Sequence, residues 1–288
     1  GYSLTRSQTG ADGQTRPGLQ GLLYYLTPHT EGLTIHRFLQ ISLDAMSQLF
    51  FSLSVSMGIM ITYGSYVKPQ VNLSKSVNQI EVFDTGVALI AGIMIIPAVF
   101  VFSGTEGMNA GPSLMFISLP KVFSAMGTAG IFVGALFFIC AIFATLTSCI
   151  SVLESIVANC MEIFHTSRKK TVLVLSGIYL AATACIALGY SVFYFEVLLP
   201  NGSTGQLLDV MDYISNSVMM PFIALISTIL IGWVVGPQYV TDEVERNGEK
   251  FRRKALYRVM IRYVAPLMMF VLFLQSTGVL SMILKWFD

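Results

Sequence analysis

The amino-acid sequence predicts an all-α membrane protein, a polytopic bundle of about six transmembrane helices. Composition is the first reason: 54% of the residues are hydrophobic, 11% are charged and the mean hydropathy is +0.70. A soluble domain would carry charge on about a quarter of its residues. The second reason is a series of apolar runs that each reach the roughly 20 residues needed to cross a hydrocarbon core. No nucleophile motif accompanies the three histidines, so we do not expect an enzyme.

The spans are expected to follow a polar opening segment. Residues 1–41 are predicted to form an extracellular loop segment, and they are not a signal peptide, because they lack its apolar core. Residues 42–288 are predicted to form the transmembrane domain, with spans at approximately 42–63, 82–102, 130–155, 171–190, 212–235 and 257–280. The four cysteines show no CxxC pattern, which favours small buried apolar residues over a disulfide framework or a metal site.

The basic residues predict how the chain crosses the membrane. Twelve of the 17 Lys and Arg residues fall after the first, third and fifth spans or at the start of the sixth. The positive-inside rule places these twelve in the cytoplasm and both chain ends outside a plasma (inner) membrane. A polar segment of about forty residues without a signal sequence would have to be translocated unaided, so we expect a fragment that lacks an odd number of upstream spans. The formal net charge of +1 gives no indication of a nucleic-acid partner.

The stretch Ser42–Tyr66 is predicted to be a helix that is broken within the membrane. Along it Ser52, Ser54 and Ser56 alternate with a period of two, so a continuous α-helix would point Ser54 away from the other two. Backbone at membrane depth unwinds only where it is buried in protein or lines a cavity, as in the binding sites of secondary transporters. The alternative is an ordinary helix whose serines bond back to their own carbonyl groups.

The third span carries a second polar cluster. Ala144, Thr147, Ser148, Ser151 and Ser155 recur at spacings of three and four, which places them on one helix face. Small and hydroxyl-bearing residues on a membrane helix favour close helix packing. Hydroxyl and carbonyl oxygens are also the ligands that a hard cation such as sodium prefers. The sequence alone leaves both interpretations open.

Three carboxylates fall within or near the predicted spans. Asp84 lies near the inner start of the second span, Glu154 deep in the third, and Asp212 at the outer start of the fifth. An ionised group in hydrocarbon is costly and indicates a functional site, although one near a span end can simply reach the interface.

Five segments of the sequence carry a resemblance to a known family. They are FFSLSVSMGIMITYGSY, FDTGVALIAGIMIIP, GPSLMFISLPKVF, FATLTSCISVLE and LDVMDYISN. In this order and spacing they resemble helices six and seven, the outer loop, and helices eight and ten of the neurotransmitter:sodium symporter family, as in its bacterial-type members. The resemblance covers nearly the whole chain beyond about Pro17. It implies part of an inverted-repeat, leucine-transporter-like fold, from the loop before helix six to helix eleven, with the five N-terminal helices as a missing partner.

The resemblance also implies a substrate pocket. Phe51 matches the aromatic lid over the substrate, and Ser52 matches the hydroxyl residue that contacts the substrate carboxylate and the first sodium ion. The family often has glycine where this chain has Ser56. The remaining pocket positions implied by the resemblance are Ser54, Ser56, Met57, Ser148 and Val152.

Two sodium sites are implied in the same way. Ser52 and Asp84 match ligands of the first site, and Ala144 through its carbonyl, with the Thr147 and Ser148 hydroxyls, matches the second. Chloride is not expected, because Asp84 resembles the variant in which a carboxylate supplies the negative charge beside sodium. The bland alternative is that Asp84 only caps its helix.

The resemblance further implies gating residues. Asp212 matches the acidic partner of the outer gate and Glu162 that of the inner gate, while Tyr66 resembles the tyrosine that braces the inner gate. The arginine partners of both acids would lie in the absent first helix.

The sequence is thus interpreted as part of a sodium-coupled symporter of amino acids or related small amines that works by alternating access in the lipid bilayer. Two alternatives stay open at this point. The chain is either a non-transporting regulatory or structural membrane subunit, or a non-functional truncated product.

Overall fold

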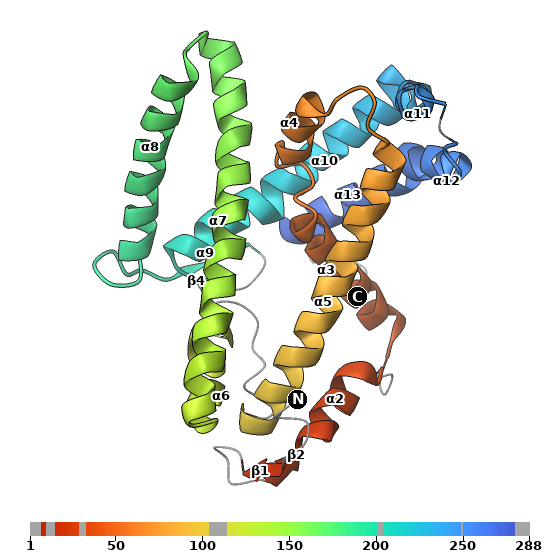
Figure 1. The fold of residues 1–288 in the computed structure, drawn as a ribbon. Helices are drawn as coiled ribbons and strands as arrows, with labels where there is room; N and C mark the ends of the chain where they lie inside the picture. The colour runs from red at the N-terminus through yellow and green to blue at the C-terminus, as the bar shows by residue number, and fades with distance from the viewer. Residues whose placement is uncertain are drawn as a thin grey trace. The chain divides into compact units, whose positions relative to one another are not determined.

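The structure is a computed structural model, and it describes residues 7–9, 15–28, 33–103, 114–200, 204–248 and 250–279. The described chain is helical apart from two short β-ribbons (Figure 1). It divides into two compact units, one of residues 1–37 and 78–148 and the other of residues 38–77 and 149–288. Each unit is considered by itself.

The first unit combines a β-ribbon with long and short helices. Its elements are β1 (Ser7–Thr9), β2 (Thr15–Pro17), α2 (Gly18–Leu26), most of α5 (Leu73–Ser103), the π-helix η2 (Leu114–Ser118), α6 (Leu119–Ala125) and the first part of α7 (Thr128–Phe164). β1 and β2 pair antiparallel.

The helix α2 packs closely on the C-terminal part of α5. A Cβ atom at Gly21 would lie 2.8 Å from the Cα of Pro97, so glycine is what allows this approach. Next to it the rings of Tyr24 and Phe100 stack with centroids 5.3 Å apart. The neighbouring side chains Val99 and Val101 are fully buried, which makes this contact a well-packed part of the unit.

The first unit also contains an apolar cavity of about 550 Å³ between α5, α6 and α7. Its walls are aliphatic, aromatic and sulfur-containing side chains, among them Met94, Phe123 and Phe137. None of the side chains that line it is charged or carries an oxygen, so it offers no side-chain ligand for the charged ends of an amino acid.

The second unit contains the remaining helices. Its elements are α3 (Ile35–Ser52, from residue 38), α4 (Ile59–Tyr66), the start of α5, the end of α7, α8 (Arg168–Leu188), β3 (Val197–Leu198), β4 (Thr204–Gly205), α9 (Leu207–Asp212), η3 (Tyr213–Met219), α10 (Met220–Ile229), η4 (Leu230–Val235), α11 (Pro237–Glu245), α12 (Lys254–Val259), η5 (Met260–Val264) and α13 (Ala265–Ser276). β3 and β4 pair antiparallel, and the stretches from α9 to η4 and from α12 to α13 each run as one long helix with π-helical turns.

The core of the second unit lies between α10 and α13, which run against each other (Figure 1). Ala224, Met269 and Leu272 are buried there, and Met46 and Phe50 of α3 pack against them. At the α9 end of this pair, the Tyr213 hydroxyl donates to the Ser276 carbonyl at 2.6 Å. Burial of these apolar side chains holds α3 against α10 and α13. It therefore also fixes the end of α3, where the predicted break begins.

Five helices of the described chain are long and apolar enough to cross a membrane, namely Leu73–Val101, Thr128–Phe164, Arg168–Leu188, Leu207–Val235 and Lys254–Ser276. They match the last five predicted spans, and the protein is a multi-pass membrane protein. Only 6–17% of the residues in their most apolar windows are buried within the chain. This degree of exposure fits helices that face lipid or other helices rather than water.

Two helices extend beyond the predicted spans. The helix of the second span begins at Leu73, before residue 82, and the helix of the third ends at Phe164, after residue 155, because both continue beyond their apolar part as polar turns. Asn72 caps the first of these extensions by accepting a bond from the Lys75 N–H at 2.6 Å. The predicted opening loop 1–41 also contains α2 and the start of α3, and the predicted end of the last span, residue 280, lies outside the described residues.

Candidate functional site

The predicted break in the first span is present. α3 ends at Ser52, α4 begins at Ile59, and residues 53–58 form turns between them. The helical ladder gives way to irregular bonds: the Ser54 N–H donates to the Phe51 carbonyl at 3.1 Å and the Val55 N–H to the Phe50 carbonyl at 3.0 Å. The alternative of a continuous helix with back-bonded serines is therefore wrong, and the predicted span 42–63 consists of two helices separated by the break.

The break contains three residues in the left-handed region of backbone conformation. Ser54 has φ 52°, Ser56 has φ 66° and Gly58 has φ 77°. Non-glycine residues adopt this region at a cost of about 1–2 kcal/mol each, and such strain is concentrated at functional sites. Ser54, Ser56 and Met57 are half-buried, whereas Phe51 and Ser52 at the end of α3 are exposed.

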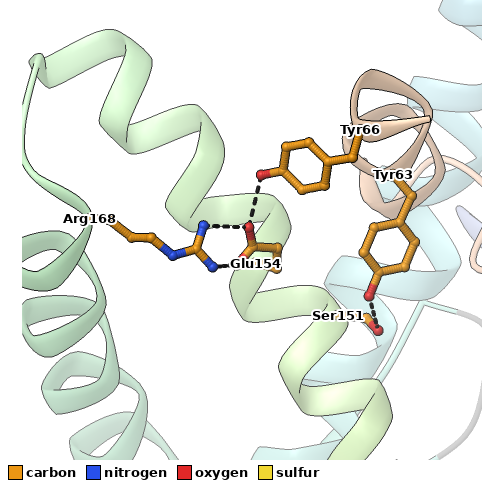
Figure 2. A network of polar contacts seen from close by, with 5 residues as sticks. All are labelled: Tyr63, Tyr66, Ser151, Glu154 and Arg168. Carbon is orange, nitrogen blue, oxygen red and sulfur yellow. Dashed lines mark hydrogen bonds and ion pairs between the residues drawn. The ribbon is translucent and has the colours of Figure 1, made fainter. Parts of the chain in front are cut away.

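The helix α4 is attached to α7 by a row of polar contacts within the second unit (Figure 2). The Tyr63 hydroxyl donates to the Ser151 Oγ at 2.6 Å. The hydroxyl of the preceding residue, Thr62, donates at 3.3 Å to the Oγ of Ser155, which lies one turn from Ser151 along α7. At the N-terminal end of α4, a Cβ at Gly58 would lie 2.8 Å from the same Ser155 Oγ. Ser151 and Ser155 thus serve close helix packing, one of the two interpretations left open by the sequence.

A charged network completes this row. The Tyr66 hydroxyl donates to Glu154 Oε1 at 2.8 Å, and Arg168 donates to both oxygens of Glu154 at 2.9 and 2.6 Å (Figure 2). The Glu154 side chain is 16% exposed and the Arg168 side chain 59%. A bidentate ion pair of this kind compensates the negative charge of the carboxylate. This explains how Glu154 is tolerated in the third span.

Sequence reasoning singled out Glu154 and Tyr66 separately but missed that they meet, and it counted Arg168 only as a cytoplasmic charge. The one available signal was that a carboxylate inside a span needs a cationic partner. Glu162, the acid that the resemblance assigned to the inner gate, is exposed farther along α7. Val152, assigned to the pocket wall, is half-buried on the same helix.

The first unit brings together the three residues expected to form the second sodium site. The Thr147 hydroxyl donates to the Ala144 carbonyl at 2.8 Å, and the Ser148 hydroxyl donates to the same oxygen at 3.2 Å. Three oxygens therefore converge on one exposed face of α7. A set of carbonyl and hydroxyl oxygens fits a hard monovalent cation and does not fit a transition metal, which prefers nitrogen or sulfur. Asp84, also in this unit, is half-buried on α5.

Asp212, assigned to the outer gate, is the last residue of α9 and is exposed. Its Oδ1 accepts a bond from the Asn216 Nδ2 at 2.5 Å. No sequence motif singles out Asn216, although its spacing of four from Asp212 places it on the same helix face.

Comparison with known proteins agrees with this arrangement. Among curated proteins, the chain is 33% identical over 269 residues to the uncharacterized sodium-dependent transporter YhdH of Bacillus subtilis, covering 91% of this chain and 56% of YhdH. It is 26% identical over 275 residues to an uncharacterized sodium-dependent transporter of Methanocaldococcus jannaschii, covering 93% of this chain and 52% of that protein. The chain thus spans about half the length of these relatives.

A solved structure gives the same result. The crystal structure of MhsT in complex with L-phenylalanine matches with a TM-score of 0.74 and 31% identity, covering 90% of this chain and 56% of MhsT. The fold is therefore the one predicted, an all-helical part of the transporter fold that MhsT represents. Residues 12–284 match the model of the family described as the sodium:neurotransmitter symporter family. With nearly the whole chain matched, this protein belongs to the sodium:neurotransmitter symporter family.

Proposed function

We propose that the chain is part of a sodium-coupled symporter that moves amino acids or related small amines by alternating access. The observation that carries this proposal is the unwound segment 53–58, with Ser54 and Ser56 held at positive φ between two apolar helices. Unwound backbone at membrane depth presents carbonyl and N–H groups to a ligand, and secondary transporters bind their substrates at such breaks.

Sodium is the coupling ion in this proposal. In the second sodium site, Ala144, Thr147 and Ser148 hold the ion through one carbonyl and two hydroxyl oxygens, and the two hydroxyls lie within hydrogen-bond distance of that carbonyl oxygen. Ser52 and Asp84 contribute to the first sodium site, where the Asp84 carboxylate supplies the negative charge. A carboxylate in this role makes chloride unnecessary, and we propose that it takes up a proton once the sodium has left, because desolvation then favours the neutral acid.

The substrate pocket is assigned to residues of the break and of α7. Phe51 covers the substrate, Ser52 contacts its carboxylate, and Ser54, Ser56 and Met57 contact its side chain, with Ser148 and Val152 on α7. The solved relative MhsT binds L-phenylalanine. We therefore place apolar and aromatic amino acids first among the substrates to test.

The gates are assigned to the two polar ends of this region. Asp212 contributes to the outer gate and Glu162 to the inner one. The contact of Tyr66 with Glu154 and Arg168 supports a bracing role for Tyr66, since it holds α4 against α7 at the end of α4. Opening on that side requires this contact to loosen.

The test is uptake of labelled L-phenylalanine into vesicles by the complete parent transporter, driven by a sodium gradient. We expect uptake to fall to background when sodium is replaced by N-methylglucamine and to persist when chloride is replaced by gluconate. In the Asp84→Asn variant sodium affinity should fall. Sodium-independent uptake contradicts the coupling. Uptake that collapses without chloride, or an unchanged sodium affinity in the Asn variant, contradicts the role of Asp84.

The isolated 288-residue chain provides a second test, because in this proposal the other half of the symporter supplies further sodium and substrate ligands. We expect vesicles that hold only residues 1–288 to show no sodium-stimulated uptake, and co-expression with the N-terminal five-helix part to restore it. Sodium-stimulated uptake by the chain alone would contradict the division of the site.

A further inference from the structure

Two π-helical turns face each other in the second unit, where one membrane span ends and the next begins. Gly232 of η4 lies so close to η5 that a Cβ atom there would be 2.7 Å from the Ile261 carbonyl oxygen. The Trp233 Nε1–H donates to the Arg262 carbonyl at 2.9 Å, and the Arg262 Nε–H donates to the Gly232 carbonyl at 3.1 Å. This reciprocal pair of bonds fixes the Arg262 side chain against η4.

Arg262 lies on the helix of the last candidate span, Lys254–Ser276, about two turns, or ~12 Å, from its start. A charged side chain on a membrane-spanning helix is costly unless an opposite charge or the interface is within reach. The bond to Gly232 uses one of the five donors of the guanidinium group, and the residue is exposed.

Arg262 belongs to a row of cations. Lys254, Arg258 and Arg262 recur at a spacing of four, which places them along one side of the helix. Lys254 is paired with Glu245 of α11 at 2.6 Å, and the charge of Arg258 also helps to hold the pKa of Glu245 below its usual range, behind the larger effect of Lys254. One carboxylate against three cations leaves a net positive charge on Arg258 and Arg262, both of them exposed.

Aromatic and apolar side chains lie beside this charge. The Trp233 and Tyr263 rings meet edge to face with centroids 5.7 Å apart, and the two residues are 60% and 57% exposed. Their neighbour Val234 is 72% exposed. Tryptophan and tyrosine are enriched at the level of lipid headgroups, where one part of the ring faces hydrocarbon and the other a polar group.

We propose that Arg258 and Arg262 bind the phosphodiester of an anionic phospholipid whose acyl chains run over Trp233 and Val234. Two guanidinium groups match the charge and the paired oxygens of a phosphodiester. A zwitterionic lipid carries a cationic group beside its phosphate, and this group competes with the two arginines for the phosphate. The site is therefore selective for anionic lipid, with Trp233 as the part of the protein in contact with the chains.

The two tryptophans of the chain allow a local test. The full 288-residue chain carrying Trp286→Phe is reconstituted into vesicles, so that the fluorescence reports Trp233 alone. Quenching is then compared between brominated phosphatidylglycerol and brominated phosphatidylcholine at equal mole fractions. We expect phosphatidylglycerol to be preferred at Trp233, and each of Arg258→Gln and Arg262→Gln to lower the preference about fivefold. Arg262→Lys keeps the positive charge but not the planar guanidinium group, and it should retain part of the preference for phosphatidylglycerol.

Lys250→Gln is the matched control, since it removes a cation from the same loop outside the span. It should leave the preference unchanged. The proposal is overturned by equal quenching from both lipids in the parent chain, by a preference that survives both arginine substitutions, or by an equal loss in the Lys250 control. Displacement by inorganic phosphate at millimolar concentration would also overturn it, because the site would then bind an anion and not a lipid. Unchanged circular dichroism of each variant shows that folding is intact.

Discussion

The hydroxyl of Tyr66 on α4 donates a hydrogen bond to the carboxylate of Glu154 on α7. The same carboxylate accepts hydrogen bonds from both terminal nitrogens of Arg168 (Figure 2). The short helix after the break is thereby held at the residue where it ends. Ser151 and Ser155 hold the preceding turns of α4 in the same way. The strained backbone of the break is therefore followed by a short helix, α4, that polar contacts hold against the long helix α7.

A double-mutant cycle measures this support. We expect Tyr66→Phe to lower the free energy of unfolding, because it removes the hydrogen bond to Glu154. Glu154→Gln should cost about 1 kcal/mol or somewhat more, because the exposed Arg168 is screened by solvent. The double variant should lose less than the sum, since both changes remove the same bond. The measurement is thermal unfolding in detergent, and strictly additive losses would show that the bond contributes nothing.

Two glycines of the same segment give a matched pair. Gly58→Ala places a Cβ atom 2.8 Å from the Ser155 Oγ at a φ of 77°, and it should destabilise the protein by about 2 kcal/mol. Gly64→Ala lies within α4, where a Cβ meets nothing within 4 Å, and should be neutral or stabilise by roughly 0.5–1 kcal/mol. Midpoints of chemical unfolding distinguish them. Equal effects of the two substitutions would contradict the strained geometry of the break.

Two threonines on α7 test the proposed sodium site. Thr147→Val in the parent transporter should weaken sodium binding by about tenfold or more, because it removes one oxygen ligand and keeps the shape. Thr145→Val is the control: its hydroxyl bonds to the Ala141 carbonyl at 2.9 Å, but it lies two residues away on another face of the helix. Sodium dependence of uptake is the readout. A similar loss in both variants would assign the effect to helix stability instead of ion binding.

The ion pair of α11 with α12 predicts a pH dependence. The hydrogen bond from Lys254 holds the pKa of Glu245 below its usual range. Because the folded pKa is the lower one, the pair stabilises the protein above the unfolded pKa, and this stabilisation is lost as the pH falls through the folded pKa. The melting temperature should therefore fall on acidification below about pH 5, and less steeply in Glu245→Gln. Parallel curves for the two proteins would rule out this contribution.

The charge distribution predicts the orientation. In a cysteine-free parent transporter, Lys169→Cys in the α8 start should react with an impermeant maleimide from the cytoplasmic side only. Val192→Cys, which is 71% exposed in the connection after α8, should react from outside only. Neither position takes part in a described contact of the candidate site. Labelling in the opposite sense would reverse the assignment of all loops.

The sequence by itself determined the membrane class, the position of the helix break and the family. These follow from local properties: hydrophobicity over about 20 residues is sufficient to define a span, and serines at a period of two cannot share a helix face. The ends of the helices, as at Leu73, do not follow from hydropathy, because hydropathy detects the part of a helix in hydrocarbon and not its capped, polar extension.

Only the tertiary structure decided how the polar residues of α7 are used. The Thr147 and Ser148 hydroxyls bond to the Ala144 carbonyl of their own helix, whereas Ser151 and Ser155 contact α4, although the sequence places all five residues on one face. The pairing of Glu154 with Arg168 likewise depends on the turn between α7 and α8, where His165 adopts φ 49°. The contacts of Ser151, Ser155 and Glu154 join different helices, so the local sequence pattern does not indicate them, and the packing of the helices decides them.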